Sequence, residues 1–124
     1  MTVSPAQQAL LQDVFAAIDR RDADGFVTYL TADAVFRFGS APPVKGRDAA
    51  REAVAGFFGT IKGLSHELSR SMAAENVLIC EGEVTYTRHD GSTVTLPFAD
   101  SFELDDGFIS HYKIYMDIGP LYAE

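Results

Sequence analysis

An acidic residue on an apolar strand face is the strongest candidate for chemistry in this sequence. Between residues 94 and 104 every second position is large and apolar except Asp100, which falls between Phe98 and Phe102. Side chains two residues apart share one face of a strand, so Asp100 is expected on the buried face. A carboxylate there is costly unless it is paired, protonated or beside a cavity. Burial would raise its pKa and make it an acid or hydrogen-bond donor near neutral pH. The alternative is a buried carboxyl group with a structural partner.

His66 is the second candidate, because it has the strand parity of Leu64, Leu68 and Met72. A neutral imidazole on that face would pair with an interior carboxyl group and accept or shuttle a proton. In the alternative, which is the more frequent case for a lone histidine on an apolar face, His66 is a satisfied structural residue of the core. The sequence leaves both interpretations open.

Glu83 is a third candidate, on a strand face shared with Glu81. If that face lines a cavity, a desolvated Glu83 becomes a possible base. In the alternative, Gly82, Val84 and Tyr86 are buried and the glutamates face solvent. The residues taken as candidate catalytic groups are therefore Asp100, His66 and Glu83.

Several tyrosines accompany these groups. Tyr112 has the parity expected of a side chain that points into the interior, where its hydroxyl would reach a ligand or carboxyl group. Tyr86, Tyr115 and His111 are expected on the opposite face of the sheet, at a possible dimer contact. Asp117 is expected to cap the turn that follows the last strand.

Composition excludes several classes of function. The chain has 124 residues, a formal net charge of −8 and no long basic run, which argues against nucleic acid and anionic membranes as partners. Cys80 is the only cysteine, so an internal disulfide is excluded and the cytoplasm is the expected compartment. The first five residues do not resemble a signal peptide. One domain spanning residues 1–124 is expected.

No metal or cofactor is expected from the motifs. The three histidines lack ligand spacing, and a single cysteine cannot form a thiolate cluster. No glycine-rich phosphate loop of the common nucleotide-binding types is present.

The elements that would position these residues follow from apolar periodicity and capping signals. Ser4 and Pro5 predict the start of a helix that runs to about Arg21, and a short second helix begins near Asp22 or Asp24. Asp48 is expected to cap a third helix that stops by Gly63. The expected strands span 34–38, 64–72, 76–88, 94–104 and 108–117, with hairpin turns at Asp-Gly pairs.

Three segments resemble the SnoaL-like branch of the nuclear transport factor 2-like superfamily. The segment 30–36 is similar to its passage from helix to strand, 46–49 to the opening of its third helix, and 106–117 to its closing strand. The resemblance covers nearly the whole chain and implies fold more than activity, since the fold hosts isomerases, hydrolases, cyclases, dehydratases and non-enzymes.

Two enzymes of the superfamily can be compared by position. Of the active-site residues of limonene epoxide hydrolase, only one has a counterpart in this sequence, the carboxylate of Glu83. The resemblance therefore does not imply the water-activating network of that enzyme. The protonated carboxyl group of ketosteroid isomerase is similar in position to Asp100. Its general base aligns with Phe38, and its tyrosine aligns near Val14. The resemblance to ketosteroid isomerase therefore implies only that Asp100 faces the cavity.

The predicted fold is α+β, a cone-shaped curved antiparallel sheet with three N-terminal helices. Its cavity should hold a small, largely apolar molecule. Three hypotheses remain: a cofactor-independent isomerase, cyclase or hydrolase, a non-catalytic ligand-binding domain, and a dimerising module with a polar core. The resemblance implies a homodimer through the outer face of the sheet. The residues expected to contact the ligand are Phe36, Phe38, Phe57, Tyr112 and Phe98.

Overall fold

The first two helices begin with side-chain N-caps at positions that the sequence predicts. In the computed structural model, which describes residues 2–123, helix α1 (Pro5–Asp19) starts with a capping box. The Ser4 hydroxyl accepts from the Gln7 backbone N–H, and the Gln7 side chain accepts from the Ser4 N–H. The Asp22 carboxylate caps the short helix α2 (Ala23–Val27) through the Gly25 N–H. The ends of the predicted domain, residues 1 and 124, lie outside the described residues.

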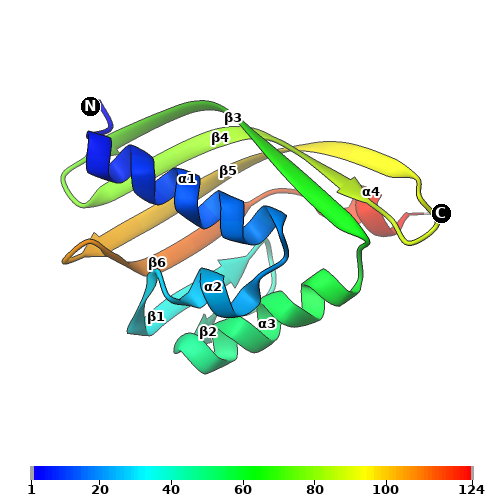
Figure 1. The fold of residues 1–124 in the computed structure, drawn as a ribbon, viewed down its shortest axis with the longest axis horizontal. Coiled ribbons are helices and arrows are strands. Elements are labelled where there is room, and N and C mark those ends of the chain that lie inside the picture. The colour runs from blue at the N-terminus through cyan, green and yellow to red at the C-terminus, as the bar shows by residue number, and fades with distance from the viewer. Residues whose placement is uncertain (1, 124) are drawn as a thin grey trace.

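Six strands form one curved sheet (Figure 1). They are β1 (Leu30–Phe38), β2 (Val44–Lys45), β3 (Gly63–Ala74), β4 (Val77–Thr87), β5 (Thr93–Asp105) and β6 (Phe108–Tyr115), in the spatial order β2-β1-β6-β5-β4-β3. The four long strands are antiparallel neighbours, as predicted. However, β1 pairs parallel with β6, so the sheet is mixed, and the prediction of a purely antiparallel sheet was wrong. The strand β2 was not predicted because two residues carry no periodicity.

The helices confirm the α+β class but not a separate block of three N-terminal helices. Helix α3 (Arg47–Gly59) follows β1 and β2, and it contacts α2 and both of those strands. The residue that precedes it is Gly46, whose φ of 95° suits glycine, and Asp48 lies within the first turn instead of serving as the cap. A short helix that was not predicted, α4 (Gly119–Tyr122), follows the last strand.

A β-bulge changes the parity of β3 part-way along its length. The register with β4 shifts between Leu68 and Arg70. Before the bulge Leu64 and His66 face inward, but after it Met72 is exposed, so the single inward face predicted for this strand was wrong beyond Leu68. The bulge lies against Gly82, where an added Cβ would come within 2.1 Å of the Glu67 carbonyl oxygen.

The core lies between the helices and the inner face of the sheet. The side chains of α1 that point to the sheet are buried, and so are alternating residues of β4 and β5. In Figure 1 the helices α1, α2 and α3 lie together on this face, with α4 at the far end of the sheet. None of the helices within residues 2–123 is long and apolar enough to cross a membrane.

Candidate functional site

A cavity of about 480 Å³ lies between the helices and the inner face of the sheet. Most of its wall is aromatic or aliphatic. The polar groups that reach it are few, chiefly those of His66, Tyr86, Asp100 and Tyr112. Exposed residues also line it at the loop after β1 and near α4, so the cavity opens to solvent there. A largely apolar hollow with a few convergent polar groups is the usual form of a small-molecule site.

Asp100 lies on the buried face of β5, as its parity predicts, and its exposed fraction is 2%. One carboxyl oxygen, Oδ2, accepts a hydrogen bond of 2.9 Å from the Tyr112 hydroxyl on the neighbouring strand β6. The other oxygen, Oδ1, has no hydrogen-bond partner among the described residues. Burial raises the pKa of Asp100 to about 7, against the lowering effect of the Tyr112 hydrogen bond. Asp100 is therefore a carboxylic acid in much of the population near neutral pH.

His66 is held by a carboxylate that the sequence did not single out. The Asp19 oxygens, at the end of α1, accept from the His66 backbone N–H at 3.0 Å and pair with Nδ1 at 2.5 Å. An ionised carboxylate only accepts hydrogen bonds, so Nδ1 must carry a proton. In the neutral ring, Nε2 then presents a lone pair. This is the carboxylate–histidine arrangement that orients a general base.

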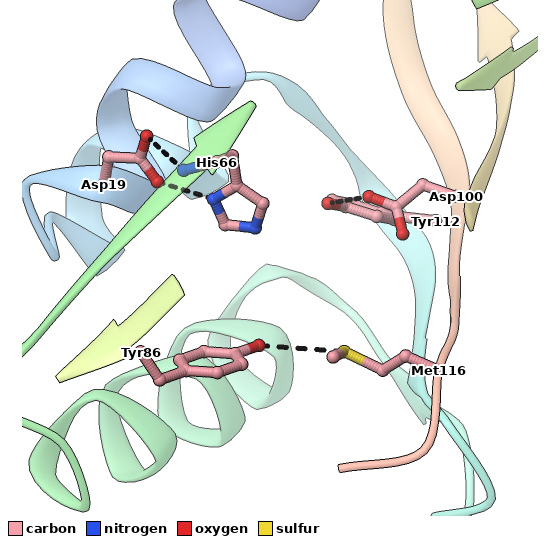
Figure 2. A network of polar contacts seen from close by, with 6 residues as sticks. All are labelled: Asp19, His66, Tyr86, Asp100, Tyr112 and Met116. Atoms are coloured by element: carbon pink, nitrogen blue, oxygen red, sulfur yellow. Dashed lines mark hydrogen bonds and ion pairs between the residues drawn. The ribbon is translucent and has the colours of Figure 1, made fainter. Parts of the chain in front are cut away.

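These two groups face one cavity from opposite sides. Figure 2 shows the His66 ring, with Asp19 behind it, on one side and Asp100 with Tyr112 on the other. His66 lies on β3 and its partner Asp19 on α1, whereas Asp100 lies on β5 and its partner Tyr112 on β6. A molecule between them would meet a proton acceptor and a proton donor at the same time.

Tyr86 supplies a further hydroxyl to this cavity. It is buried on β4, and its hydroxyl contacts the Met116 sulfur at 3.7 Å (Figure 2). Burial is the largest cause that raises the pKa of Tyr86, so the phenol is neutral at physiological pH. The prediction that Tyr86 lies on the outer face was wrong. Its neighbours Gly82 and Val84 are also buried, so this face of β4 is the inner one.

The structure places the predicted ligand-contacting residues as follows. Phe36, Phe38, Phe57, Phe98 and Tyr112 all line the cavity with Asp100 and His66. Glu83 does not: it is exposed on the outer face of β4, and its predicted place in the cavity was wrong. The physical reason is the alternation of β4, since burial of Tyr86 turns the neighbouring odd-numbered positions outward.

Two residues with predicted secondary roles also have definite positions. The Asp117 carboxylate accepts from the Gly119 N–H at 2.9 Å and so caps the turn before α4, as predicted, while also bordering the cavity. Cys80 is buried opposite Asp100 in the β4–β5 register, and burial raises the pKa of its thiol, which fits a structural cysteine. Among residues 2–123 no cluster of three or more metal-ligating side chains occurs.

The family follows from a comparison over most of the chain. A family model described as the SnoaL-like domain matches residues 11–112. The chain belongs to the SnoaL-like domain family. The resemblance drawn from segments of the sequence is thereby confirmed, and the matched region of this SnoaL-like domain includes Asp19, His66, Asp100 and Tyr112.

Solved structures share the fold of this SnoaL-like domain. TerC, co-crystallised with polyporic acid, superposes with a TM-score of 0.82 at 18% identity, covering 96% of each chain. A nuclear transport factor 2-like protein from Burkholderia pseudomallei gives 0.83 at 16% identity, covering 95% of each chain. An LEH-like epoxide hydrolase from M. tuberculosis gives 0.76 at 19% identity, covering 90% of this chain and 82% of that one. Identities this low show likeness of fold alone.

Proposed function

We propose that this SnoaL-like domain is a cofactor-independent acid–base enzyme that moves a proton on a small, largely apolar carbonyl compound. One observation carries the proposal: a histidine oriented by Asp19 and a carboxyl group of raised pKa, Asp100, line the same apolar cavity. Pairs of titratable groups held in different protonation states are typical of such enzymes. Isomerases and cyclases that pass through an enol need these two groups.

The elementary step is an enolisation. His66 Nε2 takes a proton from the carbon next to the carbonyl group, and that C–H electron pair forms the C=C bond. The carbonyl π pair moves to oxygen, which takes the proton of Asp100. The step leaves an imidazolium beside the Asp19 carboxylate, an ionised Asp100 and a neutral enol. Return of a proton to a different carbon completes an isomerisation, and attack of the enol on a second carbonyl group completes a cyclisation.

The aromatic lining of the cavity supports a small, largely apolar substrate. The curved sheet and the helices would form a cone whose interior is aromatic, as suits a flat apolar ring system. TerC, which shares the fold, was crystallised with polyporic acid. We extend from it only the proposal that the equivalent space in this chain admits a small organic molecule.

The proposal can be tested without knowing the natural substrate. The probe is 1-tetralone in D2O, and NMR follows the loss of its C2 proton signal with time. The wild-type protein should accelerate this exchange over buffer. Asp100→Asn, which keeps the size of the side chain but cannot exchange its proton, should reduce the acceleration by about 100-fold or more.

Two outcomes would contradict the proposal. The first is exchange at the buffer rate although 1-tetralone binds in the cavity, which would favour the alternative of a non-catalytic ligand-binding domain. The second is unchanged exchange in Asp100→Asn, which would remove Asp100 from the reaction. Asp13→Asn provides the matched control, because Asp13 is exposed on α1 away from the cavity.

We further propose a homodimer formed through the outer face of the sheet. Large apolar side chains are exposed there, namely Met72, Ile79 and Tyr115, and Tyr115 has an exposed fraction of 58%. Met72 and Ile79 are paired across β3 and β4. Exposed apolar groups on one sheet face are typical of a protein contact. Ile79→Lys should give a monomer by sedimentation, and a wild-type protein that is monomeric at all concentrations would contradict this.

The cytoplasm is the compartment that we propose. The support is chemical: the one thiol, Cys80, is buried and cannot form an internal disulfide. We propose a small molecule as the partner. The net charge of −8 would repel the negative charges of nucleic acids and anionic membranes. Localisation of a tagged chain would test the proposed compartment.

A further inference from the structure

The hydroxyl of Tyr86 has an unusually weak partner for a buried polar group. Among the described residues its hydrogen bond goes to the Met116 thioether, at 3.7 Å. Thioether sulfur is a weak acceptor, whereas a buried Tyr hydroxyl normally finds an oxygen or nitrogen. The Phe57 ring packs edge-on against the Tyr86 ring, with centroids 5.7 Å apart, and so fixes its orientation. The result is an oriented donor on the cavity wall whose present acceptor is easily replaced.

Tyr86 lines the same cavity as His66 and Asp100, but from a different strand. Figure 2 shows its hydroxyl below the His66 ring and across from Asp100, on a third side of the region that these residues surround. The three groups come from three strands, β3, β4 and β5. A ligand that carries one carbonyl oxygen to Asp100 therefore meets Tyr86 as a separate donor on the same cavity wall.

The charges around the cavity define the ligand further. Its lining residues include no lysine and no arginine, but they include the carboxyl groups of Asp100 and Asp117. Asp19 adds a third carboxylate behind His66. The nearest arginine in sequence to Tyr86 is Arg88, which donates to the backbone carbonyls of Pro120 and Leu121. An anionic ligand would enter an apolar space that offers no permanent cation to pair with, at a high desolvation cost.

We propose that Tyr86 is the specificity-determining residue of the cavity, and that the ligand is an uncharged aromatic or conjugated compound with two oxygen acceptors. One oxygen binds at Asp100 and the other accepts from the Tyr86 hydroxyl. This inference rests on the proposed function for the first oxygen. The second oxygen and the exclusion of anions rest on Tyr86 and on the charges of the lining.

The test compares matched probes by isothermal titration. They are 1-tetralone, its 5-, 6- and 7-methoxy derivatives, and 1-tetralone-6-carboxylate. The methoxy group places a second acceptor at three different distances from the carbonyl group. At least one isomer should bind the wild-type protein about five- to tenfold more tightly than 1-tetralone, as expected for one added hydrogen bond. The carboxylate should bind at least tenfold more weakly than 1-tetralone.

Tyr86→Phe tests whether the Tyr86 hydroxyl is the cause of the tighter binding of the methoxy compound. The substitution removes only the hydroxyl, so it should abolish the preference for the methoxy compound and leave the affinity for 1-tetralone within about twofold. Tyr115→Phe, the same change on the outer face, should keep the preference. Thermal unfolding of both variants shows whether they fold as the wild type does.

The outcomes separate this inference from the proposed function. If 1-tetralone binds and exchanges its C2 proton but no methoxy isomer binds more tightly, the inference fails and the proposed function stands. The same holds if the preference survives in Tyr86→Phe, or if the carboxylate binds best. If none of the uncharged probes binds, both fail.

Discussion

Asp19 accepts two hydrogen bonds from one residue, His66: one from its backbone N–H and one from its Nδ1. The first bond fixes the end of α1 against β3, and the second fixes the ring and its tautomer. In the proposed reaction Asp19 would therefore act through His66, as a positioning residue, since it does not itself line the cavity.

Asp19→Asn should lower the maximal rate of proton exchange while the affinity for 1-tetralone changes little. An amide can donate to Nδ1, which favours the tautomer that puts a proton on Nε2 and removes the base. We expect a fall in rate of about 100-fold or more. Rate against 1-tetralone concentration separates kcat from KM, and Asp13→Asn on the exposed face of α1 is the control. A purely structural Asp19 would change stability and leave kcat of the folded protein unaltered.

Asp100→Asn should stabilise the protein more at high pH than at low pH. The pKa of Asp100 is raised from an ordinary value of 3.8 to about 7, so between these values the folded state binds the proton and the unfolded state does not. The stability of the wild type therefore falls as pH rises from about 4 to about 7. Asn does not titrate, so the free energy of unfolding of the variant relative to wild type should rise over this window, by up to roughly 4 kcal/mol. Urea unfolding at pH 5 and pH 8, which spans about two pH units of this window, should show a rise of roughly 3 kcal/mol.

A difference between Asp100→Asn and wild type that is the same at both pH values would contradict the raised pKa. The titratable groups that face Asp100 are Tyr112 from β6, Cys80 from β4 and, across the cavity, His66 from β3 and Tyr86 from β4. These groups are common to both proteins, so the comparison isolates Asp100.

Tyr112→Phe should raise the pKa of Asp100 further. The Tyr112 hydroxyl donates to Oδ2 and so favours the ionised form, which lowers the pKa. Its removal should move the titration midpoint of Asp100 above about 7 and cost about 1 kcal/mol of stability. The carboxyl carbon shift of Asp100 against pH measures the midpoint. Tyr115→Phe is the control on the exposed side of the same strand, and a midpoint that moves down in Tyr112→Phe would refute the assigned role.

Gly82→Ala should destabilise the fold through the bulge in β3. The added Cβ would meet backbone atoms of Glu67 and Leu68, which cannot move aside without shifting the strand that carries His66. We expect a loss of about 2 kcal/mol or more in the free energy of unfolding. Gly56→Ala in α3, where an added Cβ meets nothing within 4 Å, should instead stabilise by about 0.5–1 kcal/mol. Equal effects of the two substitutions would show that the close approach is not limiting.

The sequence predicts those features that depend on local periodicity. Alternation along β5 placed Asp100 inward, and the caps at Ser4 and Asp22 placed the first two helices. The apolar walls followed because Phe36 and Phe98 lie on regular strand faces that the core must cover.

Features that depend on contacts between distant elements were not predictable in this way. Asp19 meets His66 only because α1 crosses β3, and no spacing within either segment signals that contact. Met72 was misplaced because a bulge leaves no clear mark in the pattern of β3. Glu83 was predicted to face inward and Tyr86 outward, and the structure shows the reverse. The prediction failed because each face of β4 carries side chains that are compatible with either burial or exposure. The small Gly82 beside the bulge was the one available signal.

A double-mutant cycle on proton exchange tests the central claim most directly, namely that His66 and Asp100 act on one molecule in one cavity. The rates compared are those of wild type, His66→Gln, Asp100→Asn and the double variant, with 1-tetralone in D2O at pD 6.5. Because acid and base serve the same step, each single variant should lose most of the acceleration, and the double variant should be about as slow as the slower single one. A wild-type rate in either single variant, or losses that simply multiply, would contradict the claim.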